Sequence, residues 1–407
     1  MKILLITFCF ISCSIISIAQ PITIRIDPGD AQGGTASQIF AEVNYIPLET
    51  TKESLFGKID QLAVTEDYFI ILDKATNSIL IFKKDGKFHA KIKGSNLNMN
   101  SGKQIYSFNI NPVTKQIGYQ TSGSRHIFYY NFDGRKIDEK TPISSVYQYH
   151  LFPDNTIAYY NFDVGNRTLD SISHRVFITK DNKMYKEYLP FTIKIEKDKN
   201  NDGLSVQSGN IYEMGNDTSV FMVWPYDYTV YQLTPNSFTP RYSFVFPLAN
   251  TLPEGFATDS LYDGDRSKSF QDNPNLIFRI GHTHLLGNNF FFNLSSIKNM
   301  IEGDPFSFIY NEKSGNLICI KCISPDSSNS FLPITDNGIG YDFSDSNFSY
   351  CDGKYVYTSC SSLAMFASKE NTADKNPVYP TVLENYFKTE SRKSNPVIVQ
   401  LKPKVNL

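Results

Sequence analysis

The stretch SILIFKKDGKFHAKI (residues 78–92) decides the fold. Apolar runs flank the step Asp85-Gly86, and such a step is the strongest short-range signal for a β-hairpin, because the two central residues of the turn must accept positive φ. The same unit returns as IFYYNFDGRKI (residues 127–137) and VFITKDNK (residues 176–183), and the Asp of the turn recurs twice at an interval of 48 residues. The chain is therefore built from a repeated β unit.

Two further copies of the hairpin fit at residues 229–237 and 306–316. A second pair of apolar runs, with its own turn, is expected upstream of each hairpin. Six such pairs can be counted, at residues 56–73, 105–120, 147–160, 211–224, 278–294 and 348–358. A period in the forties with several strands per unit is typical of β-propeller blades. The sequence predicts an all-β fold, a six-bladed β-propeller with four-stranded antiparallel blades.

Strands from both ends of the chain are expected to close the ring, because closure leaves no long exposed sheet edge. The candidates are residues 44–50 and the late apolar run at residues 396–401. Between residues 381 and 391, Leu383, Tyr386 and Phe387 follow helical spacing, which predicts a short helix before the closing strand.

The first 19 residues are predicted to be a signal peptide. Lys2 is followed by 16 apolar and small residues at 3–18, which is short for a membrane span and suits a signal-peptide core. Cleavage is expected before Gln20, which leaves residues 20–407 as one exported propeller domain in the periplasm or at the cell surface. A second interpretation makes Cys13 the lipid-modified cysteine of a lipoprotein, the one route to a membrane that the sequence offers.

The composition narrows the class of partner. Lys and Arg total 39 and Asp and Glu total 41, so the net charge of −2 argues against nucleic acid, which needs a clustered basic surface. Hydrophobic residues make up 41% of the chain, which is enough to bury a large core and argues against disorder.

Several of these segments together resemble a known family. Residues 45–51 followed by 59–73, the Asp85-Gly86-Lys87 turn and residues 395–399 look like the secreted six-bladed β-propeller family of Bacteroides-like bacteria, similar in style to NHL and TolB propellers. The resemblance implies a propeller in the cell envelope, and it implies no reaction. Members often carry a Gly-Pro-Gly-Glu-Tyr-like segment after the first blade, which residues 93–102 here do not match.

Four cysteines remain beyond the signal peptide: Cys319, Cys322, Cys351 and Cys360. The first two form a C-x-x-C spacing inside an apparent strand at residues 317–323. Residues three apart on a strand point to opposite faces, which argues against a redox pair. Disulfides, or small buried side chains, are the expected roles of these cysteines.

Two stretches have metal-ligand spacing. Asp198, Asn200 and Asp202, followed by Gly203, match the first half of a calcium loop, although the acid expected at its end is missing. His282 and His284 place two imidazoles on one face of an expected strand and could form half of a metal site. Solvated turn residues and an ordinary strand pair are the alternatives. No cofactor is required by the sequence, and calcium is the possible one.

The strongest candidate for ligand binding is the aromatic and acidic cluster formed by Trp224, Tyr226, Asp227 and Tyr228, because such groups stack on sugars. Packing between blades is the alternative. The sequence shows no G-x-S-x-G, P-loop, H-E-x-x-H or G-x-G-x-x-G motif. Propeller ligands collect where loops converge at the mouth of the central channel.

We therefore expect an exported, non-catalytic binding or interaction module, monomeric, with a glycan, a peptide or another envelope protein as its ligand. The alternative is a hydrolase or lyase acting on a sugar or lactone at the channel mouth. The sequence identifies no catalytic residue.

Overall fold

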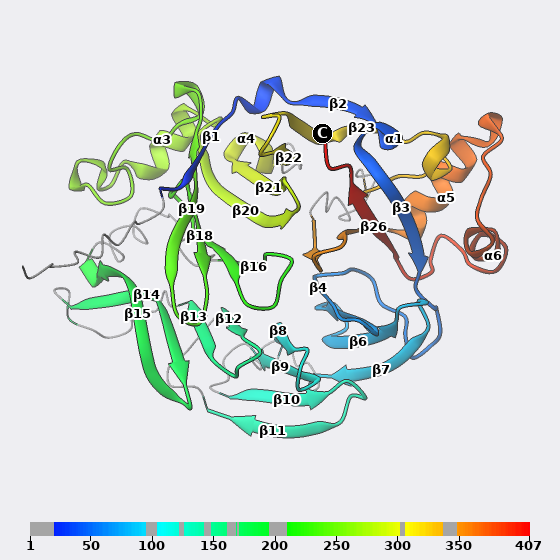
Figure 1. Ribbon diagram of the computed structural model, residues 1–407, viewed down its shortest axis with the longest axis horizontal. Coiled ribbons are helices and arrows are strands. Elements are labelled where there is room, and N and C mark those ends of the chain that lie inside the picture. Colours follow the sequence, from blue (N-terminus) through cyan, green and yellow to red (C-terminus); the bar gives the residue numbers. More distant parts are fainter. Residues whose placement is uncertain are drawn as a thin grey trace, which may run out of the picture.

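The computed structural model describes residues 20–94, 104–121, 126–141, 148–160, 168, 171–194, 210–301, 306–336 and 348–407. Six small sheets stand side by side around a common centre, as Figure 1 shows. Each sheet contains four antiparallel strands, and two of the sheets carry one additional strand. The predicted six-bladed β-propeller is confirmed.

The blades are numbered here in chain order. Blade 1 contains β4 (Gln61–Val64), β5 (Tyr68–Asp73), β6 (Ser78–Lys83) and β7 (Phe88–Lys93). Blade 2 contains β8 (Ile105–Asn111), β9 (Gln116–Thr121), β10 (Ile127–Asn131) and β11 (Lys136–Lys140). Blade 3 contains β12 (Gln148–Leu151), β13 (Ile157–Tyr160), β14 (Ile172–Lys180) and β15 (Lys183–Thr192).

Blade 4 contains β16 (Asn210–Glu213), β17 (Val220–Val223), β18 (Thr229–Leu233) and β19 (Phe238–Val245). Blade 5 contains β20 (Ile277–Leu286), β21 (Asn289–Ser296), β22 (Phe306–Asn311) and β23 (Leu317–Ser324). Blade 6 combines β24 (Tyr350–Cys351), β25 (Val356–Cys360) and β26 (Val397–Pro403) with β3 (Phe40–Pro47) from the other end of the chain. The first strand of every blade is the innermost, and each inner strand contacts those of the neighbouring blades.

The ring closes in blade 6, where β3 pairs antiparallel with β26 and places Tyr45 opposite Val399. Next to this pair, the fully buried side chain of Asn395 accepts a hydrogen bond from the Phe56 N–H at 3.0 Å. Its amide donates to the carbonyl oxygens of Glu49 at 2.8 Å and Ser54 at 3.0 Å. The two terminal segments predicted to close the ring are thus joined by a strand ladder and by one asparagine.

The N-terminal segment also wraps around two further blades, which the sequence did not predict. Strand β1 (Ile22–Arg25) pairs parallel with β19, and β2 (Gln32–Thr35) pairs parallel with β23. Figure 1 shows both strands running along the outside of blades 4 and 5 before the chain enters β3. They cover the outer edges of these two blades, which would otherwise present unpaired backbone groups.

The repeated turns are hairpins, as predicted, but two of them have a different turn geometry. In the turns between β6 and β7 and between β10 and β11, only Gly86 (φ 84°) and Gly134 (φ 76°) adopt positive φ, and the register shifts within each strand pair. The Asp residues before them stay outside that region, so the expectation of two positive φ angles is wrong there. A turn followed by a bulge explains this, because it needs only one left-handed residue. In blade 3, Asp181 and Asn182 both have positive φ.

Large aromatic side chains fill the spaces between blades. Phe221 of blade 4 meets Phe290 of blade 5 edge-on at 5.5 Å between ring centroids, and Phe291 of blade 5 meets Phe348 beside blade 6 at 4.6 Å. Each of these rings is buried. Much of the aromatic content therefore serves inter-blade packing.

Four of the described helices lie on the outside of the ring in Figure 1: α1 (Ala36–Ile39), α3 (Arg266–Asp272), α5 (Ser362–Asn371) and α6 (Thr381–Thr389). Helix α4 (Ile297–Ile301) follows β21 and lies beside the strands of blade 5. Short 3₁₀ turns lie at 28–30, 248–250, 260–262, 327–329 and 373–375. Helix α6 confirms the predicted helix and buries Leu383, Tyr386 and Phe387. Across the described residues, no helix is long and apolar enough to cross a membrane.

The four cysteines carry free thiols, and all except Cys322 are buried. Strand β23 breaks its alternation, because Ile320 and Ile323 both pack into the same hydrophobic cluster. Burial, followed by a hydrogen bond to Cys322, raises the pKa of the Cys319 thiol to about 11. The prediction that these two thiols lie on opposite faces is therefore wrong.

Candidate functional site

A central pocket of about 330 Å³ is lined by residues of all six blades. Its polar lining includes His150 on blade 3, Glu213 on blade 4, and Arg279 with His282 and His284 on blade 5. All five lie on innermost strands, which converge on the axis of the ring. The propeller thus brings together side chains that are far apart in the sequence.

The turn after β16 reaches across the centre of the ring. A Cβ on Gly215 would lie 3.0 Å from the Leu285 carbonyl oxygen and 3.1 Å from the Cα of Gly353. A Cβ on Gly353 would lie only 2.3 Å from the Gly215 carbonyl oxygen. Both glycines have positive φ, so these positions need glycine for space and for conformation. The turn of blade 4 therefore packs against the turn of blade 6 beside the pocket.

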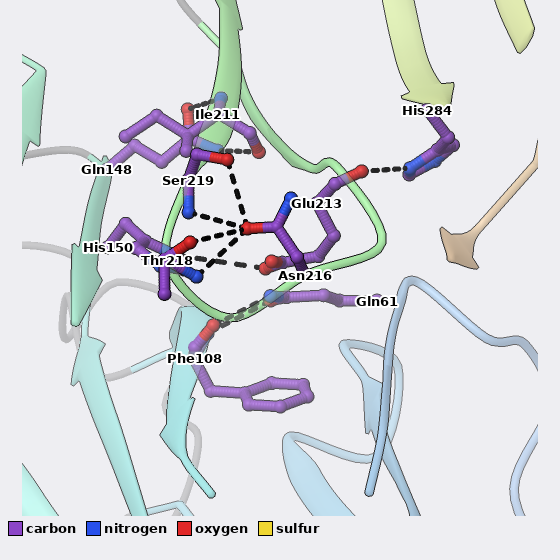
Figure 2. Close-up of polar contacts among 10 residues, drawn as sticks. All are labelled: Gln61, Phe108, Gln148, His150, Ile211, Glu213, Asn216, Thr218, Ser219 and His284. Carbon is purple, nitrogen blue, oxygen red and sulfur yellow. Dashed lines mark hydrogen bonds and ion pairs between the residues drawn. The ribbon is translucent and has the colours of Figure 1, made fainter. Parts of the chain in front are cut away.

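Two glutamines join neighbouring inner strands at the pocket wall. Gln61 of blade 1 donates to the Phe108 carbonyl at 2.7 Å and accepts from the Phe108 N–H at 3.0 Å. Gln148 of blade 3 makes the same pair of contacts with Ile211 of blade 4, at 3.5 and 3.3 Å (Figure 2). Phe108 and Ile211 lie on innermost strands, which are sheet edges, so no further strand in the described part of the chain pairs with their backbone N–H and carbonyl groups. Each glutamine side chain forms hydrogen bonds with both of these groups instead.

The histidines of blade 5 contact backbone carbonyl groups. His284 Nδ1 lies 2.8 Å from the Glu213 carbonyl oxygen and its Nε2 lies 3.2 Å from that of Phe348. His282 Nδ1 lies 3.4 Å from the same Phe348 oxygen. A neutral imidazole carries one N–H, so it can donate to only one of the two carbonyls that flank His284. Burial nevertheless dominates and lowers the pKa of both His282 and His284 to about 4.

A histidine and a carboxyl group face each other across blades 3 and 4 (Figure 2). His150 Nδ1 lies 3.8 Å from Glu213 Oε1. Burial lowers the pKa of His150 to about 4, whereas burial and then the charge of Asp217 raise the pKa of Glu213 to about 7. Both groups are therefore held toward their neutral forms, and Glu213 exchanges its proton near neutral pH.

The predicted aromatic cluster lies elsewhere. Trp224 stacks on Tyr231 with ring centroids 4.9 Å apart and planes 13° apart. The Tyr228 hydroxyl donates to the Ile277 carbonyl at 2.7 Å and accepts from the Leu252 N–H at 2.8 Å.

The other two members of that cluster also have partners within the chain. Tyr226 packs with Phe256, Phe270 and Phe278. Asp227 accepts hydrogen bonds from the Thr229 N–H and the Tyr231 hydroxyl. Among the described residues that line the central pocket, none belongs to this cluster. A role for it in ligand binding stays a prediction.

His282 and His284 both line the pocket, but the register of the strand shifts between Gly281 and His284, and His282 adopts a positive φ of 48°. Within the described residues, no third His, Cys, Asp or Glu side chain joins them to form a metal-binding group. The calcium loop predicted at Asp198, Asn200 and Asp202 lies outside the described residues. Both metal sites stay predictions, and the signal peptide and Cys13 lie outside the described residues as well.

Sequence reasoning missed His150, Glu213 and Arg279 as site residues. The signal that could have found them was present, since residues 147–152, 211–214 and 278–286 were expected to be the first strands of their blades. First strands line the axis of a propeller, so the polar residues on them were the natural candidates.

Comparison with protein families gives one match over almost the whole chain. The model of the family described as "Domain of unknown function (DUF4934)" matches residues 22–402. Among solved structures, this chain is similar to a crystal structure of a "putative exported protein" from Bacteroides fragilis, with a TM-score of 0.64 and 16% identity. The match covers 94% of this chain and 99% of that chain, and at this identity it shows the fold.

Two other structures are similar at a lower level. The β-propeller domain of Cps50 (Swd1) from Myceliophteria thermophila has a TM-score of 0.34 and 11% identity, over 69% of this chain and 75% of that chain. BamB from Moraxella catarrhalis has a TM-score of 0.36 and 10% identity, over 69% and 78%. A search of curated proteins returns no match.

Proposed function

This chain belongs to the family described as domain of unknown function DUF4934, and from that premise we propose that it is an exported, non-catalytic binding propeller of the cell envelope. Its ligand is a small polar molecule, such as a glycan unit, that enters the central pocket. The observation that carries the proposal is the pocket itself, which is lined by all six blades and collects His150, Glu213 and Arg279. Concave sites with a few converging polar groups are the usual places for ligands.

Export is supported by the apolar segment at residues 3–18 and by the fold shared with the Bacteroides fragilis protein. The test is fractionation of cells that express the full chain with a C-terminal tag. We expect a processed chain in the envelope or medium that begins at Gln20. Retention of the unprocessed chain in the cytoplasm would refute export, and labelling by a fatty-acid probe that is lost in Cys13→Ala would assign lipid anchoring instead.

Ligand binding is tested by a screen of glycans and peptides against the protein purified in its exported form. Two single variants then locate the site, His150→Ala in the pocket and Trp224→Ala in the aromatic cluster. We expect a ligand whose affinity falls with His150→Ala and is unchanged by Trp224→Ala. The reverse result would indicate that the ligand binds at the aromatic cluster. An affinity that is unchanged in both variants would refute ligand binding in the central pocket.

One observation favours the second candidate, a hydrolase or lyase acting on a sugar or lactone. A carboxyl group with a pKa of about 7 in a pocket, as in Glu213, is suited to general acid or base catalysis near neutral pH. The test is a panel of glycosides and lactones with wild type and Glu213→Gln. Turnover by wild type that Glu213→Gln abolishes would replace the binding proposal with the enzymatic one.

A further inference from the structure

Arg279 is a cation of the central pocket for which the described residues supply no carboxylate partner. It lies on β20, the inner strand of blade 5, and lines the pocket. Its Nη2 reaches the Tyr212 hydroxyl at 3.4 Å, and its buried Nε has no hydrogen-bond partner in the part of the chain that the structure describes. Across the described residues, the guanidinium forms no ion pair with a carboxylate.

Arg266, on the outside of the ring, shows how this protein treats an arginine that serves the fold. Its side chain is 2% exposed, and its Nη1 lies 2.8 Å from Asp263 Oδ1. Its Nε donates to the Phe256 carbonyl at 2.8 Å and its Nη2 donates to the Asp259 carbonyl at 2.8 Å. All three nitrogens of Arg266 thus contact an acceptor, whereas the described residues give Arg279 one long contact, to a hydroxyl.

A guanidinium that is partly removed from water and left without an anion destabilises the fold, because lost hydration is not replaced. Such a group persists where a ligand supplies the missing partner. We propose that the central pocket binds a ligand through a carboxylate group that pairs with Arg279. This inference rests on the proposed function, since it names the class of ligand for the same pocket.

The surroundings of Arg279 suit the carboxylate of a compact ligand. The ring of Tyr212 lies beside that of His282, with centroids 5.3 Å apart, and its hydroxyl points to the guanidinium. An Arg–carboxylate pair is charge-assisted and directional, and the Tyr212 hydroxyl can donate to the same anion. One corner of the pocket thus offers a cation and a hydroxyl donor to one anion.

The remainder of the pocket argues that the ligand carries few negative charges. Asp60, Glu213 and Asp217 also line it, and they would repel a second anionic group. Lys74 is the other cation in the lining. Together with His150 these groups suit hydroxyls, which can both donate and accept. A sugar acid, which combines one carboxylate with several hydroxyls, fits this distribution.

The experiment measures binding by calorimetry at low ionic strength, with D-glucuronate and D-galacturonate as probes. Glucose and galactose serve as neutral partners of the same shape, and acetate separates a simple anion from a sugar acid. We expect a uronate to bind and its neutral sugar to bind at least tenfold more weakly. Arg279→Gln should weaken uronate binding at least tenfold, and Arg279→Lys should weaken it less.

Arg135→Gln is the matched control, because it removes the same charge from an exposed hairpin of blade 2. It should leave uronate binding unchanged. If acetate binds with the same affinity as the uronates, and this affinity depends on Arg279, the result would support an anion-binding site. It would overturn the inference that the ligand is a sugar acid. Neutral sugars that bind as well as uronates, with no effect of Arg279→Gln, would overturn the inference and leave the proposed pocket function standing.

A second measurement does not depend on the choice of ligand. The melting temperature of Arg279→Gln without ligand should equal or exceed that of wild type, because the variant removes an uncompensated charge. Arg266→Gln should lower the melting temperature by several degrees, because it breaks an ion pair and leaves backbone acceptors unpaired. A large drop in Arg279→Gln would show that the guanidinium serves the fold, and it would overturn the inference.

Discussion

The closure of the ring in blade 6 and the central pocket treat buried polar groups in opposite ways. At the closure, the oxygen and the amide of Asn395 have three hydrogen-bond partners within 3.0 Å. In the pocket, Arg279 Nε has no partner among the described residues, and the His284 ring faces two carbonyls although its neutral form can donate to only one. The hydrogen bonds of Asn395 stabilise the fold, whereas Arg279 keeps a buried donor that a ligand in the pocket can pair.

The largest expected effect tests the closure. Asn395→Ala removes the partner of the Phe56 N–H and of the Ser54 carbonyl. It also removes one of two donors to the Glu49 carbonyl, which keeps the hydrogen bond from the Ser54 hydroxyl at 2.7 Å. The free energy of unfolding should fall by about 3 to 5 kcal/mol, because each buried unpaired group costs about 1–3 kcal/mol. Denaturant unfolding measures this change.

Asn44→Ala is the control for this variant. Asn44 lies on β3 of the same blade, but its side chain is exposed and donates a hydrogen bond to Gln400 Oε1 at 3.2 Å. It should change stability by less than about 0.5 kcal/mol. Equal effects of the two variants would contradict the view that Asn395 joins the ends of the ring.

The next effect concerns the histidines of the pocket. The pKa of His150, His282 and His284 is about 4 in the fold and 6.5 ordinarily, so their neutral forms are favoured by folding. Their contribution to stability is complete above pH 6.5 and is lost as pH falls through 4. Each contributes at most roughly 3 kcal/mol over this window.

Replacing His284 by Gln should flatten the stability profile between pH 6.5 and 4. Unfolding in denaturant, measured at several pH values, gives this profile. Asn395→Ala should shift the whole profile downward without changing its slope, because asparagine does not titrate. Part of the slope remains in His284→Gln, because His150 and His282 titrate over the same window. An unchanged slope in His284→Gln together with a reduced slope in Asn395→Ala would reverse the comparison.

A smaller effect is expected for the glutamine that joins blades 1 and 2. Gln61→Ala removes both contacts to the Phe108 backbone and should cost about 1–2 kcal/mol of stability. Gln104→Ala is the control, since its exposed side chain makes one contact, to the Lys74 carbonyl. Denaturant unfolding should give a larger loss of unfolding free energy for Gln61→Ala than for Gln104→Ala. Equal losses would indicate that the Gln61 side chain is not needed to join the inner strands.

The smallest expected effect concerns Glu213, whose contribution to stability falls as pH rises, opposite to that of the histidines. The pKa of Glu213 is raised to about 7 from 4.5, so its contribution is present below pH 4.5 and is lost as pH rises through 7. Glu213→Gln should therefore be more stable than wild type at pH 8, by on the order of 1 kcal/mol given its partial exposure. At pH 4 the two should be equal.

Asp217→Asn sharpens this prediction, because the charge of Asp217 adds to the rise in the pKa of Glu213. In this variant the loss of stability should occur at a lower pH than in wild type. An unchanged midpoint would show that burial alone perturbs Glu213.

Periodicity and turn chemistry were sufficient to predict the propeller. The Asp85-Gly86 unit and its repeats located the hairpins, and the pairs of apolar runs located the strands closely. These signals are local, because a strand is recognised by alternation over a few residues and a turn by one or two residue types. The backbone geometry within the turns was predicted less well. In the turns at Gly86 and Gly134, a bulge follows the turn, so the glycine adopts positive φ and the preceding Asp does not.

The outer wrapping of β1 and β2 had no such local signal. Residues 22–25 and 32–35 are short, and their pairing depends on edges of blades 4 and 5 that are more than 200 residues away. The C-x-x-C spacing in β23 misled for a similar reason, because a break in the alternation reversed the expected face of one thiol.

By itself, the sequence determined that this chain forms a six-bladed ring closed by its two ends, because repeated local patterns and two complementary terminal strands admit few other arrangements. Only the tertiary structure decided which polar residues matter. His150, Glu213 and Arg279 come from three blades and meet only because six inner strands converge on one axis. The shifted pKa values of His150 and Glu213, and the Arg279 Nε that has no partner among the described residues, arise from that convergence, which no single segment of the chain encodes.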